Sequence, residues 1–97
     1  MTITKQQDGT KLTVFIEGKL DAVTSQQFEE ELGDLNGVEE LVLDIKELVY
    51  TSSAGLRVML NAQKIMYEQG KMVVRNTNED VWKIFKETGF DKILVIE

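Results

Sequence analysis

The sequence contains no histidine, no cysteine and no proline, and two of these absences exclude whole classes of chemistry. Without cysteine there is no disulfide framework, no thiolate nucleophile and no cysteine-ligated zinc site. Without histidine the chain lacks the usual general base at neutral pH and the commonest metal ligand, so Ser-His-Asp and Cys-His catalytic groups are excluded. The sequence also lacks a Gly-x-x-x-x-Gly-Lys-Ser/Thr phosphate-binding loop. We therefore expect a protein that is not an enzyme and that needs neither a metal nor a cofactor.

The chain contains fewer positively charged than negatively charged residues. It has 11 Lys and Arg residues against 17 Asp and Glu residues, which gives a formal net charge of -6. Nucleic acids and anionic membranes are polyanions, so this charge argues against both as partners. Long apolar runs are absent as well, since uninterrupted apolar stretches extend over only a few residues, such as Leu41-Val42-Leu43, far below the ~20 residues of a membrane span. The N-terminus lacks the apolar core of a signal peptide, and we expect a cytoplasmic protein.

A chain of 97 residues fits one domain, and we expect residues 1–97 to form it. Asp8-Gly9 separates two apolar, partly alternating segments, which predicts an antiparallel hairpin of strands near 2–6 and 11–17. Further on, three short apolar runs are typical of strands buried on both faces of a parallel sheet; they cover 41–45, 72–74 and 93–96.

Three helical segments alternate with these strands. Thr24 followed by Gln27 has the form of a capping box and predicts a first helix over about 25–35. Glycines and an N-capping Asn78 delimit two more helices, over about 53–69 and 79–88. The alternation predicts an α/β fold with a mixed, mostly parallel sheet of about five strands, an N-terminal hairpin and helices packed against the sheet.

The predicted helix 53–69 is the most informative element. Its exposed stripe, at helical spacing, consists of Arg57, Asn61, Lys64 and Glu68. The opposite face, which we assign to the core, carries Met59, Ala62 and Met66. Apolar residues flank the stripe on both sides, among them Leu56, Leu60, Tyr67, Val58 and Ile65. These flanks are either the margins of a wide core face or, in part, an exposed surface that binds a partner.

Thr51-Ser52-Ser53-Ala54-Gly55 precedes this helix, at the edge of the sheet where ligands and reactive groups collect in α/β proteins. A serine there either caps the helix or offers a modifiable hydroxyl. A phosphate at a helix N-terminus meets free N–H groups and a favourable dipole. Extending the helical wheel backward puts Ser53 beside the exposed stripe and Ser52 toward the core. The acidic residues Asp21 and Asp44 either cap turns or approach this segment.

The segment from Leu48 to Val58 resembles the signature loop and helix of STAS domains, and more narrowly of bacterial anti-sigma factor antagonists. Gly18-Lys19-Leu20-Asp21, Leu43-Asp44 and Thr88-Gly89-Phe90 support the resemblance, which extends over nearly the whole chain. It implies an antagonist that binds an anti-sigma factor, itself a serine kinase, and so frees a sigma factor for transcription. The kinase phosphorylates one loop serine, the complex dissociates, and a phosphatase resets the switch.

By this resemblance the phosphorylated residue is Ser53, with Ser52 as the alternative acceptor. The partner-binding residues it implies lie in the loop, the first turns of the following helix and the turn before the first helix: Thr51, Ser52, Ser53, Ala54, Gly55, Leu56, Arg57, Leu60 and Asp21. The loop departs from the usual Asp-Ser-Ser/Thr-Gly, because Ser52 occupies the Asp position and Ala54 the second hydroxyl position. We expect the free protein to be a monomer. The alternatives are a STAS scaffold or sensor that is not phosphorylated and, as a third hypothesis, a small nucleotide-binding protein.

Overall fold

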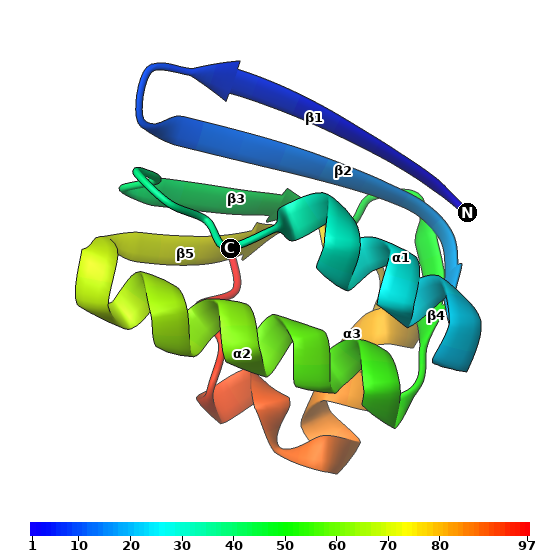
Figure 1. Cartoon of the computed structure of the whole chain (residues 1–97). Coiled ribbons are helices and arrows are strands. Elements are labelled where there is room, and N and C mark those ends of the chain that lie inside the picture. The colour runs from blue at the N-terminus through cyan, green and yellow to red at the C-terminus, as the bar shows by residue number, and fades with distance from the viewer.

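A mixed sheet of five strands forms the framework of the chain (Figure 1), and the computed structural model describes residues 1–97. The strands are β1 (Thr2–Asp8), β2 (Lys11–Leu20), β3 (Glu40–Asp44), β4 (Leu48–Thr51) and β5 (Lys71–Arg75). The helices are α1 (Ala22–Leu32), α2 (Ser53–Gln69) and α3 (Glu79–Thr88), followed by a short 3-10 turn at Phe90–Lys92. No helix has the length and apolar character needed to cross a bilayer.

The N-terminal hairpin and the parallel core of the sheet are confirmed. β1 pairs antiparallel with β2 from Thr2 opposite Glu17 to Asp8 opposite Lys11. Gly9 provides the positive φ of 62° that the tight turn requires. β2 then pairs parallel with β3, and β3 with β5. The order β1-β2-β3-β5 therefore makes β1 an edge strand and buries β3 between two neighbours.

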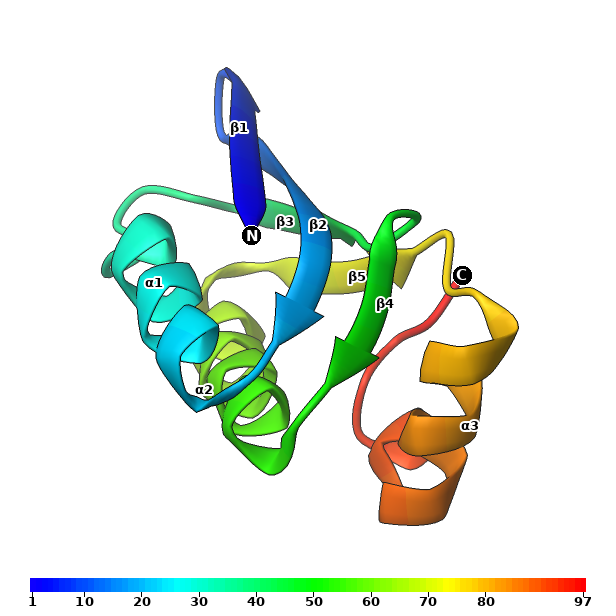
Figure 2. The same cartoon turned by 90° about the vertical axis from the view of Figure 1, so that its right-hand side faces the viewer.

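The long strand β2 contacts two different partners along its length, and this positions the candidate site. Its first half pairs with β3, whereas its last residues pair parallel with β4, after an irregularity between Gly18 and Lys19. Figure 2 shows β2 and β4 running side by side and ending at the same edge. Because α1 follows β2 directly and α2 follows β4, the first turns of the two helices are brought together.

The core lies between the sheet and the helices. α1 and α2 pack against each other on one face of the sheet, and α3 packs against β4, on the side of that strand that faces away from α1 and α2 (Figure 2). The exposed stripe and the core face predicted for α2 are both confirmed: Arg57 and Lys64 are exposed, whereas Met59 and Met66 are fully buried. Trp82, in α3, is partly buried against the core.

The predicted bounds of the first helix, 25–35, are wrong at both ends. α1 begins at Ala22 with Asp21 as its N-cap, and Thr24 is the third helical residue and not the cap. The carboxylate of Asp21 accepts hydrogen bonds from the backbone N–H groups of Val23 and Thr24. In return the backbone N–H of Asp21 donates to the Thr24 hydroxyl. The helix ends at Leu32, because Gly33 takes a positive φ of 63°.

The fifth strand is not the one predicted. Residues 93–96 form only a single bridge between Val74 and Ile96, after the 3-10 turn. Their apolar run is not buried on both faces, because Leu94 is buried while Val95 is 55% exposed. The fifth strand is instead β4, at residues 48–51, which the sequence pattern did not reveal. The predicted number of strands and the α/β class remain correct.

Candidate functional site at the N-terminus of α2

The ends of β2 and β4 hold the loop before α2 against the turn before α1. The backbone N–H of Ser52 donates to the carbonyl oxygen of Leu20 at 2.7 Å. Thr51 is 2% exposed, and its hydroxyl donates to the carbonyl oxygen of Ser52 at 3.1 Å. Thr24 holds the turn before α1 in place, because its hydroxyl donates to the carbonyl oxygen of Lys19 at 2.6 Å. The loop is thus fixed by backbone contacts that hold its serines in defined positions.

The two serines of the loop have different roles in the structure. Ser52 is the N-cap of α2, and its hydroxyl oxygen accepts from the backbone N–H of Gly55 at 3.4 Å. Ser53 is the first helical residue and is exposed, as the helical wheel predicted. Capping uses the oxygen of Ser52, whereas no hydrogen bond involves the side chain of Ser53. Ser53 is therefore the more available hydroxyl of the pair.

Gly55 allows the first turn of α2 to approach β2 and β4 closely. A Cβ at this position would collide with the hydroxyl oxygen of Thr51 and lie 2.8 Å from Cβ of Leu20. Both neighbours are almost completely buried and have little room to move. The absent side chain of Gly55 therefore fixes how deeply the helix start sits, and with it the position of Ser53.

The residues named from the sequence divide by burial into two groups. Asp21, Ser53 and Arg57 are exposed, and Ser52, Ala54 and Leu60 are half-buried. Thr51, Gly55 and Leu56 are buried. The exposed and half-buried residues form the first group, which lies at or near the surface around the start of α2, where a partner can reach it. The buried group instead holds the backbone of the loop in place.

Sequence reasoning missed three exposed apolar side chains close to this loop. Val23 in α1 is 75% exposed, and Val49 and Tyr50 in β4 are 52% and 46% exposed. They come from the segments that flank Asp21 and Thr51, whose strands end side by side. The signal for Val49 and Tyr50 lay in the short strand β4, where Leu48 is buried and both of these residues are exposed. Exposed apolar side chains near the loop suit contact with a protein partner.

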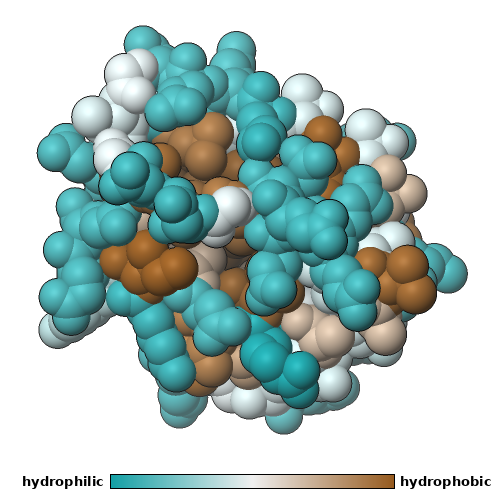
Figure 3. Space-filling model, viewed as in Figure 1, coloured by the Kyte–Doolittle hydropathy of each residue, from teal (hydrophilic) through white to brown (hydrophobic).

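A shallow groove runs between α1 and α2 from this loop. Near the loop, a cavity of about 290 Å³ is lined by residues of both helices, including Ser25, Glu29, Ala54 and Arg57. A second cavity of about 290 Å³ follows along the helices and shares Glu29 and Val58 with the first. Figure 3 shows separate brown, hydrophobic patches among teal, hydrophilic side chains on this face of the molecule. The cavity near the loop is therefore lined mainly by polar residues, and the one further along the helices mainly by apolar residues.

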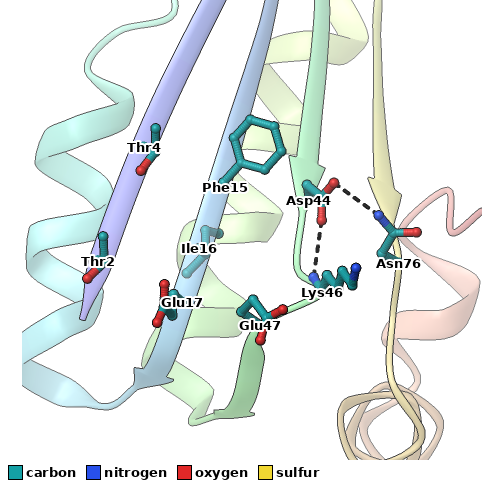
Figure 4. Close-up of a pocket in the computed structure, with 9 residues that line it drawn as sticks. All are labelled: Thr2, Thr4, Phe15, Ile16, Glu17, Asp44, Lys46, Glu47 and Asn76. Carbon is teal, nitrogen blue, oxygen red and sulfur yellow. Dashed lines mark hydrogen bonds between the residues drawn. The ribbon is translucent and has the colours of Figure 1, made fainter.

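Asp44 lies in a different part of the molecule and does not line the cavity beside the serine loop. It borders a separate cavity of about 340 Å³ where β3 and β5 end (Figure 4). Its two carboxylate oxygens accept from the backbone N–H of Lys46 at 3.1 Å and from the side-chain amide of Asn76 at 3.0 Å. The turn role that we considered for Asp44 is thus confirmed, and so is the capping role of Asp21.

The capping carboxylate of Asp21 predicts how acid affects stability. The backbone N–H and then the hydroxyl of Thr24, with the N–H of Val23, hold the pKa of Asp21 below its ordinary value of 3.8. A lowered pKa in the folded state contributes stability that is complete above the unfolded value and is lost as pH falls through the folded value. We expect Asp21→Asn to lower the melting temperature at pH 7, because asparagine caps without the charge. In thermal unfolding, the deficit relative to wild type should shrink as the pH falls below 3.8 and disappear below the folded-state pKa of Asp21; an equal deficit at every pH would contradict this.

Comparison with known proteins agrees with this fold. The chain belongs to the STAS domain family, whose sequence model matches residues 2–97. It is 29% identical over 96 residues to the anti-sigma-B factor antagonist of Listeria monocytogenes, covering 96% of this chain and 84% of that one. It is 31% identical over 99 residues to BtrV of Bordetella bronchiseptica, a protein named for the anti-sigma factor antagonist role, covering 99% and 85%.

Solved structures share the fold at lower sequence identity. The anti-sigma factor antagonist SpoIIAA in its unphosphorylated form superposes with a TM-score of 0.84 at 15% identity, over 99% of this chain and 88% of that one. The Thermotoga maritima protein TM1081 superposes with a TM-score of 0.87 at 18% identity, over 97% and 84%. The sheet, the hairpin and the three helices of this chain therefore form the same fold as SpoIIAA and TM1081.

Proposed function

We propose that this chain is an anti-sigma factor antagonist, which binds an anti-sigma factor with serine kinase activity and thereby frees a sigma factor. The surface that binds the partner consists of the end of β4, the start of α2, and the first turn of α1 with the residue before it. Exposed members of this surface are Asp21, Val23, Tyr50, Ser53 and Arg57. The names of its relatives support the role, and the acidic net charge of -6 is consistent with action through another protein rather than on DNA.

The observation that carries the proposal is the exposed hydroxyl of Ser53 at the first helical position of α2. A kinase would transfer the γ-phosphoryl group of ATP to this oxygen. The new O–P bond forms as the bond to ADP breaks, and the hydroxyl proton passes to a base of the kinase. The phosphate adds about -1.5 to -2 charges at pH 7 amid a surface with exposed apolar groups. Its desolvation in the interface then disfavours the complex, and a phosphatase that removes it restores binding.

The phosphorylation step is tested directly by mass. The chain is incubated with ATP and the anti-sigma factor kinases of its source genome, one at a time, and its intact mass is measured. We expect one phosphate on the wild type and on Ser52→Ala, and none on Ser53→Ala. A phosphate that persists on Ser53→Ala and vanishes on Ser52→Ala would move the switch to Ser52. Retained binding with no phosphate from any kinase would favour an unphosphorylated STAS scaffold.

A further inference from the structure

The end of β2 receives less support from the sheet than the rest of this strand. Its pairing with β3 stops at Phe15, and its pairing with β1 stops at Glu17. Lys19 and Leu20 pair only with β4, after the register shifts between Gly18 and Lys19. Such an irregularity disrupts the ladder of backbone hydrogen bonds locally. The position of this strand end therefore depends on contacts from outside the sheet.

Leu20, the last residue of β2, contacts the start of α2 in two ways. Its carbonyl oxygen accepts from the backbone N–H of Ser52 at 2.7 Å. Its side chain is fully buried and lies so close to Gly55 that a Cβ there would be 2.8 Å from Cβ of Leu20. Ser52 and Gly55 lie on either side of Ser53 in the sequence. A displacement of Leu20 therefore displaces the start of α2, and Ser53 with it.

Thr24 holds the peptide group between Leu20 and Asp21. The N–H of this group belongs to Asp21 and donates to the hydroxyl oxygen of Thr24 at 2.8 Å. The carbonyl oxygen of the same group is the one that accepts from Ser52. Because a peptide group is planar, a bond that orients its N–H also orients its carbonyl. The Thr24 hydroxyl also donates to the carbonyl oxygen of Lys19 at 2.6 Å, so it fixes the peptide groups on both sides of Leu20.

We propose that Thr24 is a positioning residue for Ser53. Its hydroxyl orients the peptide group that follows Leu20, the carbonyl of this group holds Ser52, and the loop then presents Ser53 to the kinase in one position. The inference rests on the proposed phosphorylation of Ser53. Thr24 lies on α1 and Ser53 on α2, so the connection runs between two helices through the end of β2. A loop that is already ordered does not have to be ordered on binding, and this favours the complex.

The hydroxyl of Thr24 is expected to affect the affinity for the kinase and not the chemical step. Without the hydroxyl, the loop spends part of its time with Ser53 displaced. The kinase binds only the remaining fraction, which raises the apparent dissociation constant. Once the complex has formed, Ser53 occupies the same place as in the wild type. For phosphorylation by the anti-sigma factor kinase, KM should therefore rise while kcat is retained.

Thr24 has a second structural role, from which the positioning role must be distinguished. It is the third residue of α1 and completes a capping box with Asp21. A role limited to capping would lower the melting temperature of a variant without the hydroxyl, but it would leave the hydrogen bond between Ser52 and Leu20 unchanged. The positioning role predicts that this bond weakens in the folded protein.

Thr24→Val tests the proposal, because valine keeps the branched shape of threonine and removes the hydroxyl. The NMR coupling across the hydrogen bond, between the Ser52 nitrogen and the Leu20 carbonyl carbon, reports that bond directly in the folded chain. We expect this coupling to weaken in Thr24→Val. We also expect KM for phosphorylation to rise roughly threefold, from the loss of hydrogen bonds that hold the loop. Thr24→Ser retains the hydroxyl and should restore both quantities.

Thr88→Val is the matched control, because the Thr88 hydroxyl also donates to a backbone carbonyl oxygen, that of Ile84, at 2.8 Å. Thr88 is the last residue of α3, so this variant should change neither the coupling nor KM, whatever its melting temperature. Wild-type coupling in Thr24→Val would overturn the proposal, and so would a weakened coupling with an unchanged KM. If no kinase phosphorylates the wild type, the proposed function fails, and the coupling alone decides whether Thr24 positions the loop.

Discussion

Ser53→Asp is expected to weaken binding to the anti-sigma factor kinase by roughly 100-fold or more, because a charge buried without a partner in an interface costs several kcal/mol. The same substitution should leave the melting temperature nearly unchanged. Ser53 is exposed at the first helical position of α2, where a carboxylate interacts favourably with the helix dipole. Affinity is measured by calorimetry or surface plasmon resonance with the purified kinase, and stability by thermal unfolding.

The effect of the new side chain's size on affinity must be distinguished from the effect of its charge. Ser53→Asn is nearly the same size as Ser53→Asp and is neutral, so it should retain most of the affinity. Ser52→Asp provides a positional control, because its carboxylate replaces a capping hydroxyl and faces the first-turn N–H groups of α2. Equal affinity of the wild type and Ser53→Asp would refute the charge mechanism. Equal losses in Ser53→Asp and Ser53→Asn would show that the side-chain volume alone matters.

Helices α2 and α3 could be predicted to the residue because strong local signals fix their ends. Ser52 and Asn78 cap their N-termini with side-chain oxygens, and Gly70 and Gly89 follow their last residues. Each of these signals acts within one turn of the helix, so neighbouring residues alone determine it. The apolar face of α2 then follows from the spacing of Met59, Ala62 and Met66.

The start of α1 and the identity of the fifth strand depend on contacts that a local pattern does not contain. Asp21 and Thr24 are both good caps, and Thr24 becomes the third helical residue because its hydroxyl also donates to the carbonyl oxygen of Lys19. β4 has only four residues, and the strand it pairs with is β2, about 30 residues earlier in the chain. The apolar run at 93–96 was a stronger local signal for a strand, but it pairs through a single bridge.

The same distinction applies to the candidate site. The exposure of Ser53 follows from helical periodicity, so a helical wheel drawn from the sequence alone predicts it. The exposure of Tyr50 and Val49 depends on β4, and the proximity of Val23 depends on β2 and β4 ending together. The exposure of these three side chains near the loop therefore depends on tertiary structure, which the local sequence pattern does not contain. Their contribution to binding is a proposal that single alanine substitutions can examine together with Ser53→Asp.

Gly55→Ala is expected to destabilise the fold by about 2 kcal/mol and to weaken partner binding as well. The new Cβ would collide with the hydroxyl oxygen of Thr51 and approach Cβ of Leu20 at 2.8 Å. Overpacking costs about 1–3 kcal/mol, and two contacts shorter than 3.0 Å with buried neighbours place Gly55→Ala at the upper end of that range. Replacing glycine by alanine in a helix offsets up to ~1 kcal/mol of this cost, which leaves the net loss of about 2 kcal/mol. To relieve the contact, α2 must move away from β2, and Ser53 moves with it.

Thermal and urea unfolding measure the cost of Gly55→Ala, and Thr51→Ala tests its cause. Removing the hydroxyl of Thr51 eliminates one of the two contacts, so the double variant should be less destabilised than the sum of the two single variants. Ala54→Gly, at the preceding and half-buried position, is the control for the backbone effect alone. Strict additivity of Thr51→Ala and Gly55→Ala, or wild-type stability of Gly55→Ala, would show that the helix start has room for a side chain. The position of Ser53 would then not depend on the close approach at Gly55.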